Sequence, residues 1–170
     1  MDLNELESII TKIPDYPKPG ILFYDISPVI NNAEAFSFTI NKIKDKIVSY
    51  KIDKIAAIDA RGFIFGAAVA QKMNLGLTLI RKSGKLPGKV LKKKYDLEYG
   101  TNTLEANPLY LNGRVALIDD LLATGGTAKA SIELIRKSGA EVTCFCTFIE
   151  LEFLSGKDDL GVPYESIIKY

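Results

Sequence analysis

Apolar runs alternate with helical stretches along most of the chain, and this alternation restricts the possible folds more than any other feature of the sequence. Residues 54–59, 75–82, 114–120 and 141–150 are dominated by apolar or β-branched residues and are predicted to form buried strands. Stretches with apolar residues at helical spacing follow the first and the third of these strands. Strands joined in this way are typical of a parallel sheet covered on both faces. We therefore expect an α/β fold with a mainly parallel twisted sheet flanked by helices.

The N-terminal part of the chain predicts further elements beside this sheet. Apolar residues at helical spacing predict one helix over residues 3–13 and another over 36–47, with Asn31 or Asn32 as the N-cap of the second. Residues 14–32 are rich in proline but contain apolar residues throughout. They are therefore expected to form a structured loop rather than a linker.

Residues 85–113 interrupt the alternation of strands and helices. The stretch is rich in lysine and lacks a period that would build a core, so we expect a long flexible loop with a functional role. Within it, Lys92, Lys93 and Lys94 are expected to form a solvated face rather than to bind a ligand. Residues 163–170 are expected to form a fifth strand at the edge of the sheet.

The charge balance and the apolar runs exclude several classes of protein. Lys and Arg number 22 and Asp and Glu 21, so no excess of positive charge favours nucleic acid or a membrane surface. No apolar run reaches the roughly 20 residues of a membrane span. The first ten residues are acidic and amphipathic, unlike a secretory signal, and Cys144 and Cys146 are read as buried thiols. A cytoplasmic location is expected.

The chain contains no histidine. A Ser–His triad, a histidine general base and histidine metal ligands are therefore excluded. Any acid–base chemistry must use carboxylates, lysine, tyrosine or cysteine.

The stretch "VALIDDLLATGGTAKA" (115–130) predicts an anion site where a strand runs through a glycine turn into a helix. Backbone N–H groups at a helix N-terminus bind anions, and Gly125 and Gly126 permit close approach. Thr124 and Thr127 add hydroxyl donors. Neither the Walker pattern G-x-x-x-x-G-K-[ST] nor the dinucleotide pattern G-x-G-x-x-G occurs in the chain.

Asp119 and Asp120 stand immediately before this turn. Two carboxylates do not suit phosphate, but they suit a sugar diol as acceptors, or Mg²⁺ through its waters. A ribose with a phosphate on its 5′ carbon satisfies both halves of the stretch. The alternative is a polar strand end followed by an ordinary turn.

The same stretch resembles the phosphoribosylpyrophosphate (PRPP) loop of the type I phosphoribosyltransferases, and "DDLLATGGT" is typical of the adenine phosphoribosyltransferases. The resemblance extends from about Leu6 to Tyr170. The other stretches that carry it, in chain order, are "PDYPKPGILFYDISPV", "ARGFIFG", "LIRKSGKLPG" and "YDLEYG". It implies a single phosphoribosyltransferase domain over residues 1–170, with an N-terminal helix and hood (1–32) and a flexible loop region (85–113).

The resemblance implies the reaction and its participants. Phosphoribose passes from PRPP to adenine, which gives AMP and pyrophosphate in purine salvage. Mg²⁺ is carried by PRPP without a dedicated protein ligand, although a water-mediated contact to Asp119 or Asp120 fits. A homodimer is implied, with neither nucleic acid nor a membrane as partner.

The resemblance also assigns residues of this chain to parts of the substrates. The 5′-phosphate is expected to be held by Ala123, Thr124, Gly125, Gly126 and Thr127. The ribose is expected to meet Asp119 and Asp120. The pyrophosphate is expected to be held by Arg61, Arg81, Lys82 and Lys85. Phe23 is expected to stack on one adenine face and Leu121 to pack on the other, while backbone groups of Leu22 and Tyr24 read the 6-amino edge. The alternative for Phe23 is a plain core residue.

The catalytic residues implied are Glu98, for acid–base work on the purine nitrogens, Tyr99, for positioning, and Arg61. An exposed loop glutamate is the alternative for Glu98. The chain departs from the family at Tyr24, where many members have arginine, and at Ala60, where some have serine.

Two other functions remain open at this point, besides a structural partner or a pseudo-enzyme. One is the same fold acting on another purine or on a pyrimidine base. The other is a non-catalytic PRPP-binding regulator, although residues 1–13 offer no helix-turn-helix and no basic patch.

Overall fold

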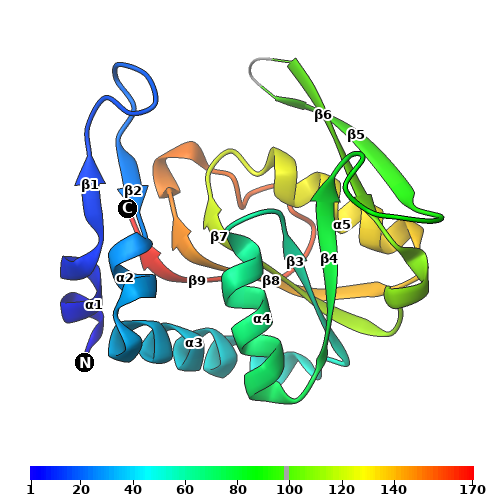
Figure 1. The fold of residues 1–170 in the computed structure, drawn as a ribbon, viewed down its shortest axis with the longest axis horizontal. Coiled ribbons are helices and arrows are strands. Elements are labelled where there is room, and N and C mark those ends of the chain that lie inside the picture. The colour runs from blue at the N-terminus through cyan, green and yellow to red at the C-terminus, as the bar shows by residue number, and fades with distance from the viewer. Residues whose placement is uncertain (98–99) are drawn as a thin grey trace. The chain divides into compact units, whose positions relative to one another are not determined.

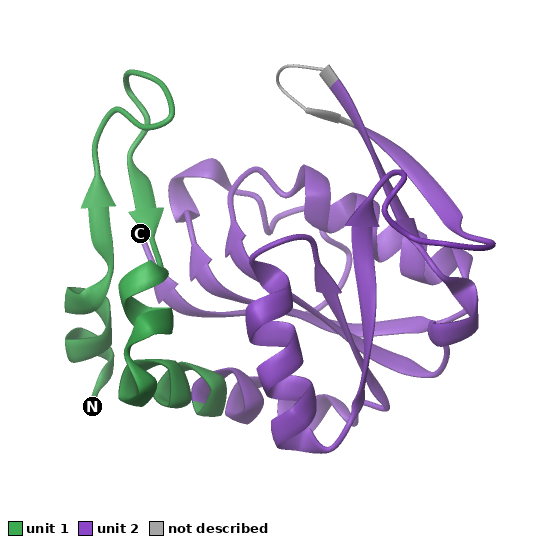
Figure 2. Ribbon diagram, in the orientation of Figure 1, with its two compact units in different colours: residues 1–41 green, residues 42–170 purple. Residues whose placement is uncertain are grey.

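The computed structural model of the chain describes residues 1–97 and 100–170. These residues form two compact units, residues 1–41 and residues 42–170 (Figure 2). No helix within the described residues is long and apolar enough to cross a membrane. The expectation of a single domain stays a prediction.

The unit of residues 1–41 contains short helices and one small antiparallel sheet. Its elements are α1 (Leu3–Ile9), β1 (Thr11–Ile13), β2 (Phe23–Asp25), α2 (Ser27–Asn31) and the first part of α3 (Ala33–Ile47). The predicted helix over 3–13 is wrong beyond Ile9, because residues 11–13 pair with β2, with Ile13 opposite Phe23. The predicted cap of α3 is confirmed, since the Asn32 side chain accepts a hydrogen bond from the N–H of Ala35 at 3.0 Å.

The unit of residues 42–170 is built on a seven-stranded sheet in the order β5-β6-β4-β3-β7-β8-β9 (Figure 1). Its strands are β3 (Lys54–Ile58), β4 (Gly76–Lys82), β5 (Leu91–Leu97), β6 (Gly100–Ala106), β7 (Arg114–Leu122), β8 (Glu141–Glu150) and β9 (Tyr164–Lys169). Its helices are the end of α3, α4 (Gly62–Met73) and α5 (Gly126–Lys137), with short 3-10 turns η1 (Val48–Tyr50), η2 (Pro108–Tyr110) and η3 (Glu152–Leu154). The expected α/β fold with a mainly parallel sheet is confirmed, because β4, β3, β7, β8 and β9 run parallel.

Helices α4 and α5 cover opposite faces of this sheet. On one face, Phe65 of α4 packs on Phe148 of β8 with ring centroids 5.4 Å apart. On the other, Ile132 and Ile135 of α5 join a buried cluster with Phe145 of β8. Successive side chains of a strand point to opposite faces, which explains how β8 supplies both layers.

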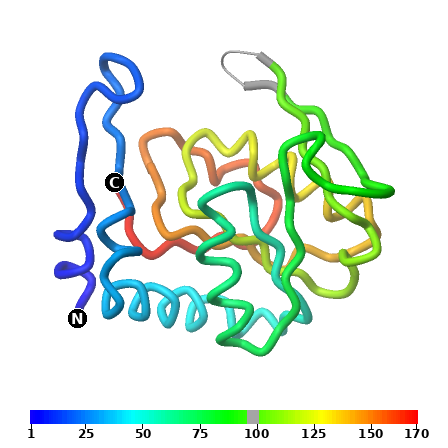
Figure 3. The backbone as a smooth tube through the Cα atoms, in the orientation of Figure 1, coloured from blue at the N-terminus to red at the C-terminus, as the bar shows by residue number. Residues whose placement is uncertain are grey.

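The carboxyl ends of the parallel strands lie along one edge of the sheet. β3 is followed there by residues 59–61, and β7 by residues 123–125, which lead into α5 (Figure 3). Ligands of open α/β sheets bind beyond this edge. The fold therefore brings together stretches that the sequence analysis selected separately.

Residues 85–113 differ from the expected loop, because β5 and β6 form an antiparallel pair there. Leu104 and Ala106 of β6 are fully buried. Strand β5 was not predicted because its consecutive lysines give no alternation of apolar and polar residues. Glu98 and Tyr99, which were predicted to be catalytic, lie outside the described residues.

Cys144 and Cys146 are buried and unbonded to each other, as predicted. Burial raises the pKa of the Cys144 thiol to about 12, so it stays protonated near neutral pH. These thiols are core residues.

Gly66 of α4 lies directly against β3, and a Cβ atom there would overlap the Cβ of Ala57. Alanine in a helix interior normally stabilises by roughly 0.5–1 kcal/mol relative to glycine, but overpacking costs roughly 1–3 kcal/mol. We therefore expect Gly66→Ala to lower the free energy of unfolding by about 1–2 kcal/mol in urea denaturation.

The double variant Gly66→Ala/Ala57→Gly tests this cause, since it removes the overlapping atom from β3. It should be more stable than the sum of the two single changes predicts. A Gly66→Ala protein as stable as the parent would show that the two elements move apart at no cost.

Candidate active site

A cavity of about 440 Å³ opens at the carboxyl ends of β3 and β7. Its lining comes from residues 58–61, residues 119–128, and Lys82, Tyr95, Asn102 and Leu104. The cavity therefore brings together the two predicted acids, the whole predicted phosphate loop, Arg61, Lys82 and Leu121. All of these residues belong to the unit of residues 42–170.

The predicted phosphate loop connects β7 to α5. Gly125 has φ +83°, a left-handed conformation that favours glycine, and α5 begins at the next residue. The first N–H groups of a helix have no partner within it, so the start of α5 offers hydrogen-bond donors. With residues 123–127 along the cavity wall, the chain has the backbone geometry of an anion site here.

Asp119 and Asp120 are the acidic part of the cavity. The Asp119 carboxylate accepts a hydrogen bond from the N–H of Asp120 at 2.9 Å, and Nη2 of Arg61 lies 2.8 Å from Oδ2 of Asp120. That oxygen is buried, and apart from this ion pair it accepts no hydrogen bond from the residues that the structure describes, so it has room for a further donor. Such an oxygen is suited to a ligand hydroxyl.

Burial is the main reason why the pKa of both carboxyls is raised. The negative charge of Asp120 raises the pKa of Asp119 further. The Arg61 guanidinium acts in the opposite direction and is the main influence that lowers the pKa of Asp120. Arg61 therefore helps to keep the acids ionised.

The start of α4 adjoins the same acids. A Cβ at Gly62 would come within 2.6 Å of Oδ1 of Asp119 and 3.2 Å of the carbonyl oxygen of Ile118. Glycine at this position therefore lets α4 begin close to β7 and leaves room for the Asp119 carboxylate.

A third acid of the cavity lining, Asp59, pairs with two of the predicted pyrophosphate ligands. Its Oδ2 lies 3.3 Å from Nε of Arg81 and 3.7 Å from Nζ of Lys85, and its side chain is almost fully buried. Nη1 of Arg81 also donates to the carbonyl of Lys85 at 3.2 Å. The Asp59–Ala60 peptide bond is cis. Sequence analysis missed Asp59, although a polar residue at the end of a buried apolar run was a usable signal.

Glu105 of β6 holds the segment that carries Lys85. The buried carboxylate accepts hydrogen bonds from the N–H groups of Lys85 at 2.7 Å and Leu86 at 2.8 Å. Burial alone would raise the pKa of Glu105, but these backbone donors and Lys92 outweigh it and lower the pKa. No local pattern in the sequence distinguishes this residue from an exposed glutamate.

Strand β5 contacts the phosphate loop through Tyr95. The Thr127 hydroxyl donates to the Tyr95 hydroxyl at 3.3 Å, and both residues line the cavity. Lys93 pairs with Glu133 of α5, so it is not purely solvated as predicted, whereas Lys94 is exposed. Sequence analysis missed Tyr95.

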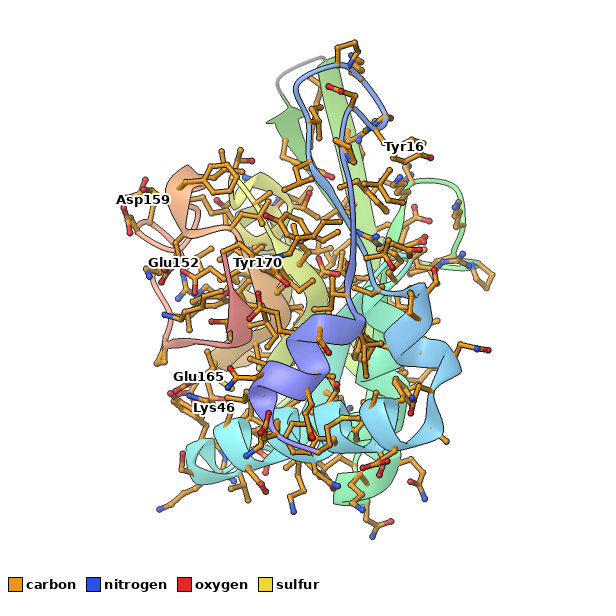
Figure 4. The ribbon with its side chains drawn as sticks, turned by 90° about the vertical axis from the view of Figure 1, so that its left-hand side faces the viewer. Tyr16, Lys46, Glu152, Asp159, Glu165 and Tyr170 are labelled. Carbon is orange, nitrogen blue, oxygen red and sulfur yellow. The ribbon has the colours of Figure 1, made fainter. Side chains whose placement is uncertain are left out.

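The predicted adenine contacts Leu22, Phe23 and Tyr24 lie in the unit of residues 1–41. Leu22 is exposed, Tyr24 is buried, and Phe23 is half-buried. The Phe23 ring meets the ring of Tyr16 edge to face at 5.1 Å, and Figure 4 shows Tyr16 on the loop between β1 and β2. Phe23 is therefore only partly a core residue.

Comparison with known proteins agrees with this geometry. The family model of the phosphoribosyl transferase domain matches residues 29–163. The chain is 45% identical to the adenine phosphoribosyltransferase of Rhodospirillum centenum over 98% of both chains. The structure of the enzyme of that name from Thermoanaerobacter pseudethanolicus is similar with a TM-score of 0.96 and 43% identity, over 99% of this chain and 100% of that one.

A third relative was solved with ligands. It is adenine phosphoribosyltransferase from Saccharomyces cerevisiae, complexed with adenine and an imino-altritol bisphosphate. Its TM-score is 0.92 at 33% identity, over 97% of each chain.

The pair formed by Arg61 and Asp120 predicts how ribose 5-phosphate binding depends on pH. Ionised carboxylates are the better acceptors for ribose hydroxyls, and a raised pKa means that they protonate at a higher pH than ordinary aspartates. Affinity should therefore fall as the pH is lowered. In Arg61→Gln the pKa of Asp120 rises further, so the fall should begin at a higher pH, as measured by calorimetry without Mg²⁺.

Lys94→Gln is the matched control, because it removes one positive charge from an exposed site outside the cavity. It should leave the pH midpoint unchanged. Equal midpoints in the parent and in Arg61→Gln would contradict the assigned influence of Arg61.

Proposed function

Because the chain belongs to the phosphoribosyltransferase family, and within it to the adenine phosphoribosyltransferases, we infer that it transfers the phosphoribosyl group of PRPP to adenine and forms AMP and pyrophosphate. One observation in the structure carries this function most directly. A single cavity combines two adjacent acids, the start of a helix with its glycine turn, and basic side chains. The acids are complementary to a diol, the start of the helix to a phosphate, and the basic side chains to a pyrophosphate.

The 5′-phosphate is proposed to bind to residues 123–127. Backbone N–H groups at the start of α5 donate to its oxygens, and the hydroxyls of Thr124 and Thr127 add donors. The helix dipole favours the negative charge at this end. This contact fixes one end of the substrate.

The ribose hydroxyls are proposed to meet Asp119 and Asp120. The remaining acceptor capacity of Oδ2 of Asp120, which contacts only Arg61, and the position of Asp119 on the cavity wall support this role. As pyrophosphate leaves, positive charge develops at the anomeric carbon, and nearby carboxylates stabilise it. The acids therefore bind the ground state and favour the transition state.

The leaving pyrophosphate is proposed to bind to Arg61, Arg81, Lys82 and Lys85. Arg61 and Lys82 line the cavity, and the other two pair with Asp59, which also lines it. Guanidinium and ammonium groups stabilise the charge that collects on the leaving oxygen.

Adenine is proposed to bind to Leu22, Phe23, Tyr24 and Leu121. A backbone carbonyl accepts from a 6-amino group but cannot accept from a 6-oxo group. Glu98 is proposed to exchange protons with the purine nitrogens while ring N9 attacks, and Tyr99 to position it. In a chain without histidine, a carboxylate is an available acid or base.

Mg²⁺ is proposed to enter with PRPP. The described residues contain no group of three Asp, Glu or Cys side chains that would hold a metal ion by themselves. The paired carboxylates offer the oxygen atoms that hydrated Mg²⁺ prefers, so the site fits a metal held mainly by substrate. When bound, Mg²⁺ neutralises part of the pyrophosphate charge. We further propose a homodimer that works in cytoplasmic purine salvage.

A competition assay tests the reaction and its base specificity. Purified protein is mixed with PRPP, Mg²⁺ and equal amounts of adenine, hypoxanthine, guanine and orotate, and the nucleotide products are separated by chromatography. AMP should be the main product. A different nucleotide would move the chain to another base specificity. PRPP binding without any product would indicate a regulator.

Glu98→Gln tests the assigned acid–base residue. It should keep PRPP binding but lower kcat by roughly 10²–10⁴-fold, the usual contribution of general acid–base catalysis. Glu141→Gln, at the exposed start of β8, is the matched control and should keep full activity. Unchanged kcat in Glu98→Gln would remove this residue from the mechanism.

A further inference from the structure

The segment after β8 lies against the back of the phosphate loop. It runs from Leu151 through η3 and Gly156 to β9. Figure 4 shows Glu152 and Asp159 on this segment, with Tyr170, the residue after β9, close to Glu152. The N–H of Glu152 donates to the carbonyl of Tyr170 at 2.8 Å. None of the roles proposed above involves this segment.

Two glycines bring the segment into direct backbone contact with the loop. A Cβ at Gly156 would overlap the carbonyl oxygen of Ala123 and lie 2.9 Å from the backbone nitrogen of Gly125. In the reverse direction, a Cβ at Gly125 would overlap the carbonyl of Gly156. Gly156 has no left-handed φ, so only lack of space requires glycine there. The contact is thus steric, and it involves the loop that is proposed to hold the 5′-phosphate.

A buried carboxylate holds the segment in this position. Glu150, at the end of β8, is 2% exposed, and its Oε1 lies 2.9 Å from Nζ of Lys157, the residue after Gly156. Its Oε2 accepts a hydrogen bond from Ser166 of β9 at 2.9 Å. A buried carboxylate is costly to leave without its partners, so these contacts restrain the position of Lys157.

Further contacts fix both ends of the segment. The N–H of Leu151 donates to the carbonyl of Leu122, the last residue of β7, at 2.9 Å. Asp159 lies 3.0 Å from Nζ of Lys129 in α5, and Leu160 is buried in the core. The segment is thus attached to the two elements, β7 and α5, that the phosphate loop connects.

We propose that Gly156 and Lys157 are positioning residues for the 5′-phosphate: Lys157, held by Glu150, keeps the Gly156 backbone against residues 123–125, so that the amides of the loop stay in place for the phosphate. This inference rests on the proposed function, because it assumes a phosphate at this loop. Neither residue touches the ligand. They act through the backbone of the loop, where a misplacement of about 1 Å can cost on the order of 10²-fold.

The main test is Gly156→Ala. The added Cβ must push either the segment or residues 123–125 out of place. The dissociation constant for ribose 5-phosphate, measured by calorimetry, should rise by about ten- to a hundredfold. In the enzyme assay KM for PRPP should rise more than KM for adenine, and the melting temperature should fall by no more than the several degrees that overpacking costs.

Gly76→Ala is the matched control. Gly76 also lacks a left-handed φ, and a Cβ there meets nothing closer than Cε of Lys54 at 3.8 Å. It lies at the opposite end of the parallel strands, so ribose 5-phosphate affinity should be unchanged.

A second pair of variants tests the ion pair without adding an atom to the backbone contact. Lys157→Met should weaken ribose 5-phosphate binding, and Lys157→Arg should restore it. If Gly156→Ala fails to fold, this pair decides the question. Unchanged affinity in folded Gly156→Ala, or in Lys157→Met, would overturn the proposal. So would an equal rise of KM for PRPP and for adenine.

The behaviour of the parent protein distinguishes a failure of this inference from a failure of the proposed reaction. A parent protein that binds ribose 5-phosphate but makes no AMP would refute the reaction, while the calorimetric comparison would still test the role of Gly156. If the parent did not bind ribose 5-phosphate at all, both would fall.

Discussion

The parallel pairing of β3 with β7 is the constraint on which the rest of the cavity depends. The two strands are in register from Lys54 opposite Val115 to Ala57 opposite Ile118. Because they run in the same direction, the chain leaves both of them at one edge. Residues 59–61 therefore meet the paired acids, although about sixty residues separate them in the sequence. The packing of α4 and α5 on opposite faces keeps this edge open, since each helix begins beside it.

Opposite charges lie within a few ångströms of each other at this edge, and each charged group is stabilised by its partner. Arg61 lies 2.8 Å from Asp120, and Arg81 lies 3.3 Å from Asp59. Burial raises the pKa of Asp120, and Arg61 limits the increase. A substrate with both a diol and phosphates needs acceptors and cations in one cavity. The pairs keep these groups in place because neither member is left buried alone.

Residues with a local signal could be predicted from the sequence, and residues defined by distant partners could not. The four buried runs and the turn at 123–127 have their signal within ten or so residues, and the structure places them as expected. Strand β1 was missed because its three residues pair with a segment across a proline-rich loop. Glu105 was missed because its partners come from a distant loop, and the polar strand end at Asp59 gave a local signal but not the identity of its cationic partners. The assignment of Glu98 rests on resemblance, since it lies outside the described residues.

Asp59 has a consequence for how the enzyme would turn over. Arg81 and Lys85 already share a buried carboxylate of the cavity lining. If pyrophosphate binds to Arg81 and Lys85 as proposed, these cations return to an internal counter-ion when it departs, instead of facing the solvent alone. Product and protein carboxylate would then compete for the same positive groups, which would weaken the hold on the product. An acid whose charge opposes pyrophosphate binding would thus make the site easier to empty.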